Sequence, residues 1–122
     1  EAERQLALRH RITARTADVY AEAGFTVVVQ DLFVGASLMP FLEQVTARPL
    51  SLVMLAPDVG TVMRRESERT KVGYGDLWSI RDFDLKVRAE TPHIGLWLDS
   101  SQQTPDETVD EIVARLSEAR IA

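Results

Sequence analysis

Three arginines lie near the middle of the chain, and two of them have the spacing of an anion-binding helix face. Arg65 and Arg69 are four residues apart, and Arg64 precedes them. Residues at that spacing project from the same face of a helix. Two planar guanidinium groups on one face suit the oxygens of a phosphate group. The alternative is an exposed helix on which these arginines pair with Glu66 and Glu68.

A segment containing two glycines follows the arginines, at residues 71–79 (KVGYGDLWS). Glycines this close together predict a mobile loop. We therefore expect a lid over about residues 64–90, whose arginines close over a phosphate group. Lys71 and Arg81 are candidates to join them in binding phosphate. Arg88 shares the helix face of Arg81, and we rank it below Arg81.

A carboxylate ends the most apolar run of the chain. Residues 25–30 (FTVVVQ) lack polar alternation, as expected for a central strand buried on both faces, and Asp31 follows directly. The carboxyl ends of parallel strands line the ligand crevice of open α/β sheets, so Asp31 is a candidate site residue. One alternative is a capping aspartate. Another is a response-regulator phosphoacceptor, but the required upstream acidic pair and later lysine are not seen.

A polar loop with a similar position follows another apolar run, residues 94–98 (IGLWL). The loop begins with Asp99, Ser100, Ser101 and Gln102 and leads to Thr104. These residues suit either a ligand-binding loop or a helix entry rich in cap-forming side chains, and the sequence leaves both interpretations open.

The elements that must position these residues alternate along the chain. Apolar periodicity, proline breaks and capping residues predict helices at 1–23, 37–47, 59–69, 80–90 and from 105 onward, with buried strands at 25–30, 50–56 and 94–98. This alternation predicts one α/β domain over residues 1–122, with a doubly wound, mainly parallel sheet covered by helices on both faces. Three strands are few for such a sheet, so we expect one or two more preceding Glu1.

Composition excludes several classes of function. A net charge of -5 and a pI near 5.0 argue against a general nucleic-acid surface. The chain has no cysteine, which excludes disulfides and thiolate metal sites and makes a cytoplasmic location the default. No apolar run approaches the ~18 residues of a membrane span. His10 and His93 lack ligand spacing, so no protein-held metal site is predicted.

The order of these segments resembles the chloramphenicol phosphotransferase-like branch of the P-loop kinases. The resemblance is carried by EAERQLALR, AGFTVVVQD, PLSLVMLAP, RRESERTKVGYGDLW and ETPHIGLWLDSSQQTPDETVDEIVARL. It covers nearly the whole chain and corresponds to the later two-thirds of the kinase domain. The resemblance implies a P-loop kinase-like fold and ATP-dependent transfer of phosphate, with Mg²⁺, to a hydroxyl of a small molecule such as an antibiotic, nucleoside or metabolite.

The resemblance also implies roles for individual residues. Arg65 and Arg69 would clamp the transferred phosphate, Asp31 would hold a Mg²⁺-bound water or a substrate hydroxyl, and the adenine ring would lie along the loop of Ser100, Ser101 and Gln102. The family's G-x-x-x-x-G-K-[ST] element is absent from the 122 residues, and we expect it upstream. The alternative is a non-catalytic nucleotide-binding or protein-interaction domain that has lost this element.

Overall fold

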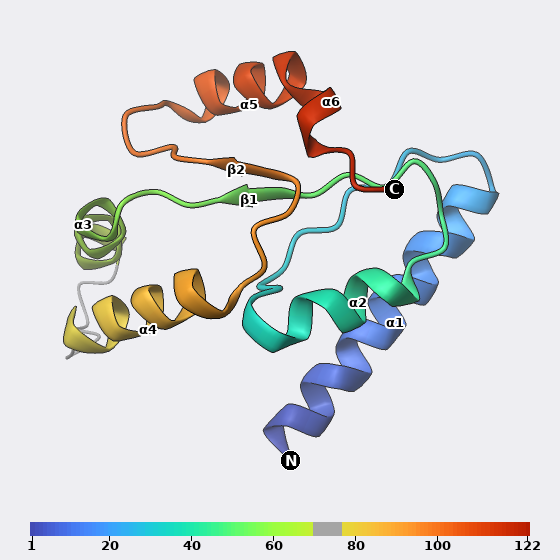
Figure 1. The fold of residues 1–122 in the computed structure, drawn as a ribbon, viewed down its shortest axis with the longest axis horizontal. Coiled ribbons are helices and arrows are strands. Elements are labelled where there is room, and N and C mark those ends of the chain that lie inside the picture. Colours follow the sequence, from blue (N-terminus) through green and yellow to red (C-terminus); the bar gives the residue numbers. More distant parts are fainter. Residues whose placement is uncertain (70–76) are drawn as a thin grey trace. The chain divides into compact units, whose positions relative to one another are not determined.

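A computed structural model describes the backbone of residues 1–69 and 77–122, and the side chains of residues 1–68 and 80–122. The chain divides into two compact units (Figure 1). The first comprises Glu1–Arg48 and Ala89–Pro92, and the second comprises Pro49–Arg88 and His93–Ala122. Each unit has its own packing.

The first unit consists mainly of two helices. Helix α1 spans Ala2–Glu22, and α2 spans Leu38–Gln44 after the short 3-10 helix η1, Gly35–Ser37. The two α-helices pack together, and between them lies an aromatic cluster in which Phe33 stacks on Phe41 with a ring separation of 3.9 Å. His10 lies 4.6 Å from the ring of Phe33 and is buried. Stacked rings of this kind contribute to stability beyond the area that they bury.

Asp18 connects α1 to the chain that leaves α2. Its carboxylate accepts hydrogen bonds from the backbone N–H groups of Thr46 and Ala47, at 3.0 and 2.9 Å, and from the Thr46 hydroxyl, at 2.8 Å. Burial by itself would raise the pKa of Asp18, but these hydrogen bonds and the nearby charge of Arg48 together hold that pKa below its ordinary value. The ionised carboxylate therefore stabilises this unit.

Replacing Asp18 by asparagine is expected to destabilise the first unit by about 2 kcal/mol, because an amide accepts fewer hydrogen bonds and presents an unmatched N–H₂ to two donors. The wild-type contribution is complete above the ordinary carboxyl pKa of 3.8 and is lost as the pH falls through the lower folded value. Denaturant unfolding at pH 7 and pH 3 measures both effects. Asp110→Asn, at an exposed position, is the control. Equal stability of the two variants at pH 7 would contradict this account of Asp18.

Residues 25–30 do not form the central strand that their sequence predicts. They lie between α1 and η1 without strand structure, and Val28 is 87% exposed. The backbone groups of residues 26–30 form no hydrogen bond with any described part of the chain. The physical reason for the difference is that an apolar run indicates which side chains favour burial, whereas a strand also needs a partner for its backbone.

The second unit contains the sheet. Strands β1, Val53–Leu55, and β2, Leu96–Leu98, run parallel, and Met54 lies opposite Trp97. Parallel strands require a long connection, which here contains α3, Val59–Arg69, and α4, Leu77–Glu90.

Two further helices, α5 and α6, follow β2. Helix α5, Pro105–Ala114, begins with a capping box, in which Thr104 and Glu107 exchange hydrogen bonds between side chain and backbone. Helix α6, Leu116–Ala119, follows directly. These local interactions explain why α5 starts where its sequence predicts.

The predicted fold class is wrong. The chain is mostly helical, and the sheet has two strands in the part that the structure describes, so it is not a doubly wound, mainly parallel sheet with helices on both faces. The helix predicted at residues 59–69 and the parallel orientation of the strands at 53–55 and 96–98 are confirmed. The difference arises chiefly from residues 25–30, whose pairing the prediction assumed.

Gly95 permits the close approach of the two strands. Its φ angle is +73°, and a β-carbon at this position would lie 2.5 Å from the carbonyl oxygen of Leu52. That same carbonyl accepts a hydrogen bond of 2.9 Å from the N–H of Leu96. A side chain at residue 95 would thus separate the strands at the start of their pairing.

Gly95→Ala is expected to destabilise the second unit by about 2 kcal/mol or more, since it adds a backbone clash to the strain of positive φ. Gly24→Ala is the matched control, because Gly24 also has positive φ but has no atom within 4 Å of the added carbon. We expect that control to cost about 1 kcal/mol. Thermal or denaturant unfolding compares the two variants, and equal losses would show that the contact with Leu52 is unimportant.

Candidate functional site

The loops that follow β1 and β2 meet at the carboxyl edge of the parallel pair. After β1 the chain passes through Pro57 and Asp58 into α3, and after β2 it passes through Asp99 and Ser101 toward α5. The backbone N–H of Asp58 donates a hydrogen bond of 2.8 Å to the hydroxyl oxygen of Ser101. Two segments distant in sequence are thereby held together where ligands bind in sheets of parallel strands.

Hydrogen bonds stabilise the ionised form of Asp58 over its protonated form. Its oxygens accept hydrogen bonds from the backbone N–H of Thr61, at 2.8 Å, and from the Thr61 hydroxyl, at 3.0 Å, which satisfies donors in the first turn of α3. Hydrogen bonding by the Ser101 hydroxyl, followed by these bonds from Thr61, lowers the pKa of Asp58 to about 2. This residue therefore carries a negative charge at neutral pH, and both of its carboxylate oxygens accept hydrogen bonds from Thr61.

Asp99 is the second carboxylate of the edge. One of its oxygens, Oδ1, accepts hydrogen bonds from the hydroxyl and, at 2.9 Å, from the backbone N–H of Ser101. These bonds lower the pKa of Asp99, while the neighbouring charge of Asp58 opposes the change. The Ser101 hydroxyl donates its single hydrogen to Asp99 and accepts a hydrogen bond from the backbone N–H of Asp58. The side chain of Ser101 thus couples the two loops.

Arginines flank the two carboxylates. Arg65 on α3 donates from Nη2 to the carbonyl oxygen of Ser100, at 3.3 Å. Arg88 on α4 donates from Nη2 to the carbonyl oxygen of Pro57 and from Nε to Asp84, at 2.8 Å. The charge of Arg88 also helps to lower the pKa of Asp99. The site therefore combines cationic and anionic groups, each attached to the loops by defined hydrogen bonds.

The structure brings some of the predicted residues together. Arg65, Ser100 and Ser101 are joined by the contacts described above, whereas Gln102 and Arg81 are exposed. The side chains of Arg69 and Lys71, and most of the loop predicted to be a lid, lie outside the described residues.

Asp31 belongs to the first unit, and no strand precedes it in the described chain. Its Oδ1 accepts hydrogen bonds from Arg9, at 3.1 Å, and from the backbone N–H of Leu32, at 2.7 Å. These contacts agree with the capping interpretation of this aspartate. The prediction that it follows a buried central strand is wrong, because residues 25–30 lack the required strand partner.

Sequence reasoning missed two residues of this site. Asp58 has the residue type of a helix cap, but it also follows the first of two parallel strands, a position that points to the same edge as Asp99. Arg88 ranked below Arg81, although its spacing from Asp84 predicts the ion pair that orients its guanidinium group. Both patterns are present in the sequence, but they indicate a common site only once β1 and β2 are known to be neighbours.

The arrangement can bind anions at Arg65. This guanidinium uses one N–H for Ser100 among the described contacts, and its other N–H groups can reach phosphate oxygens. The described residues contain no cluster of three or more side chains that would hold a metal ion by themselves. Oδ2 of Asp99, which has no hydrogen bond within the described chain, suits a Mg²⁺ ion whose other ligands are water and phosphate oxygens.

Comparison of the chain with known protein families, curated proteins and solved structures found no match in any of the three. None of the helices in the described part of the chain has the combination of length and apolar character needed to cross a membrane. The geometry of the site is therefore the basis for inferring a function.

Ser101→Ala is expected to raise the pKa of Asp58 from about 2 toward 3.8, because the hydroxyl is the first cause of its lowering. The free energy of unfolding at low pH then changes too. In the wild type, the ionised carboxylate of Asp58 stabilises the folded chain above pH 3.8, and this contribution is lost as the pH falls through about 2. Titration of the aspartate carboxyl signals by NMR measures the pKa. Ser117→Ala on α6 is the control, and an unchanged Asp58 titration in Ser101→Ala would contradict the role of Ser101 in lowering this pKa.

Proposed function

We propose that the protein takes part in ATP-dependent phosphate transfer to a hydroxyl of a small molecule, with this site holding phosphate groups of the nucleotide. The supporting observation is that Arg65, on the helix after β1, is hydrogen-bonded to Ser100, in the loop after β2. Such an arrangement places a cationic, fork-shaped donor at the carboxyl edge of two parallel strands. An anionic ligand with several oxygens is the partner that this donor suits best.

The residues of the site have distinct roles in this proposal. Arg65 binds phosphate oxygens and stabilises the negative charge that shifts during transfer. The carboxylate of Asp99 holds the loop that begins at Ser100 in the shape that contacts the nucleotide. A bound Mg²⁺ ion would neutralise phosphate charge, with Oδ2 of Asp99 as its contact on this chain. Arg69 and Lys71 are further candidates for phosphate binding.

Titration of the chain with ATP and Mg²⁺ in a calorimeter tests the phosphate-binding role of Arg65. Arg65→Ala is expected to weaken binding about tenfold or more, since a charge-assisted bond to phosphate is lost, and Arg65→Lys to recover only part of it. Arg64→Ala removes the same charge from the adjacent position of α3 and is the matched control. Circular dichroism verifies that each variant is folded.

Equal affinities of Arg65→Ala and Arg64→Ala would contradict the proposed role of Arg65. A chain that shows no ATP binding at millimolar concentration would overturn the placement of the nucleotide at this site. The same titration with Arg69→Ala tests the predicted partner of Arg65 on α3.

A second candidate is a non-catalytic nucleotide-binding domain. The observation that favours it is that both oxygens of Asp58 accept hydrogen bonds within α3, so this carboxylate is not available as a general base. ATP consumption with a panel of hydroxyl-bearing small molecules separates the two functions. Turnover that is lost in Arg65→Ala supports the transferase, whereas binding without turnover supports the second candidate.

A further inference from the structure

We infer that the chain self-associates through two oppositely charged helix faces, with α1 of one copy lying along α5 of another. The basic face of α1 consists of Leu8, Arg11, Ile12, Arg15 and Val19. The acidic face of α5 and the start of α6 consists of Asp106, Val109, Asp110, Val113 and Leu116. All of these side chains are exposed, and the apolar ones are more than half exposed. The contact makes no use of the site around Arg65.

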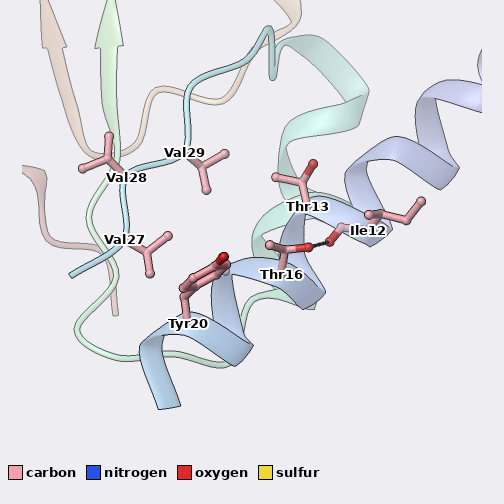
Figure 2. Close-up of a pocket in the computed structure, with 8 residues that line it drawn as sticks. Ile12, Thr13, Thr16, Tyr20, Val27, Val28 and Val29 are labelled. Carbon is pink, nitrogen blue, oxygen red and sulfur yellow. Dashed lines mark hydrogen bonds between the residues drawn. The ribbon is translucent and has the colours of Figure 1, made fainter. Parts of the chain in front are cut away.

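The basic face is the side of α1 that the described chain leaves open. The side that carries His10 packs against Phe41 of α2. Another side, which carries Thr16 and Tyr20, lines a groove beside residues 27–29 (Figure 2). At 100° per residue, the basic face lies on the remaining side of the helix. Its apolar side chains are therefore accessible to another molecule.

The two faces have the same spacing and opposite charge. On α1, Leu8 and Ile12 each precede an arginine by three residues. On α5, Val109 and Val113 each follow an aspartate by three residues. In both helices the pattern repeats after four residues, which is about 6 Å along the axis. The two arginines can therefore meet the two aspartates while the apolar side chains between them come into contact.

The order of charged and apolar residues selects a parallel contact. Viewed from the N-terminus of each helix, the arginines of α1 flank their apolar stripe on one side, and the aspartates of α5 flank theirs on the other. Two facing helices that run in the same direction bring such opposite sides together, as in parallel coiled coils. Arg11 then lies opposite Asp106 of the other copy, and Arg15 lies opposite Asp110.

The charges of both faces lack partners within the described residues. Arg9, Arg88 and Arg115 each form an ion pair with a carboxylate, whereas the arginines of the basic face and the aspartates of the acidic face form none there. Each copy has a net charge of -5, but charges more than about 10 Å apart are largely screened at 0.1 M salt. Local charge complementarity therefore directs the contact, and burial of the apolar stripes stabilises it.

Sedimentation velocity over a range of concentrations tests the self-association. The average sedimentation coefficient of the wild-type chain is expected to rise with concentration. Arg11→Glu with Arg15→Glu is expected to weaken association about tenfold or more, because carboxylates then face carboxylates. Arg81→Glu with Lys86→Glu is the matched control, since it makes the same change of charge at exposed positions of α4. A chain that is monomeric at every concentration, or equal weakening by the two variants, would overturn the inference.

Exchange of the charges between the two faces tests the partner. Asp106→Lys with Asp110→Lys is expected to weaken association as the arginine reversal does, and the chain with all four substitutions is expected to recover it. Weakening by the arginine reversal alone would mean that α1 binds a different acidic surface, which overturns the inference. Circular dichroism verifies folding. Arg11→Gln with Arg15→Gln removes the charges at little cost in helix propensity, and it should also weaken association.

Rescue of a single reversal tests the direction of the helices. In the parallel contact, Arg15→Glu is rescued by Asp110→Lys more than by Asp106→Lys, because residue 110 is the one that lies opposite residue 15. Equal rescue by the two lysines, or the reverse order, would overturn the parallel arrangement.

Discussion

The approach of β2 to β1 at Gly95 is the contact on which the candidate site depends. Each strand has three residues, so few hydrogen bonds hold the pair, and any separation at Leu52 would remove a large share of them. The C-terminal segment reinforces β1 from its own side: Leu52 donates to the carbonyl of Ala119, and Leu50 exchanges hydrogen bonds with the last two residues. Only with the strands in register can the loops after them exchange the hydrogen bond between Asp58 and Ser101.

The contact between these two loops brings the charges of Asp58 and Asp99 near each other. Two carboxylates that lie near each other repel, and each would favour protonation if left without partners. Here the Ser101 hydroxyl and the N–H groups of Thr61 and Ser101 counteract that tendency, so the carboxylates of Asp58 and Asp99 stay ionised at neutral pH. The balancing cation, Arg88, is attached to Pro57 of the adjacent loop. The arrangement is organised before any ligand binds, which would lower the reorganisation needed for the proposed anion at Arg65.

The first unit is also stabilised by a hydrogen-bonded carboxylate, together with aromatic stacking. Its helices are joined by a buried carboxylate, Asp18, whose hydrogen bonds outweigh the cost of burial, and by the stacked rings of Phe33 and Phe41. His10 packs against these rings with its Nε2 atom lacking a hydrogen-bond partner in the described chain. The unit therefore contains one fully hydrogen-bonded buried carboxylate, Asp18, and one buried imidazole nitrogen without a partner in the described chain.

The sequence by itself determined the features that local interactions control. Helix α3 and the start of α5 agree with prediction because capping by Asp58 and Thr104 acts within a few residues. The tertiary structure alone decided that residues 25–30 remain unpaired, that Arg88 reaches the loop after β1, and that Asp31 pairs with Arg9. These outcomes depend on contacts between residues distant in the chain, and an apolar run or a charge pattern specifies what a side chain favours but not which partner lies within its reach.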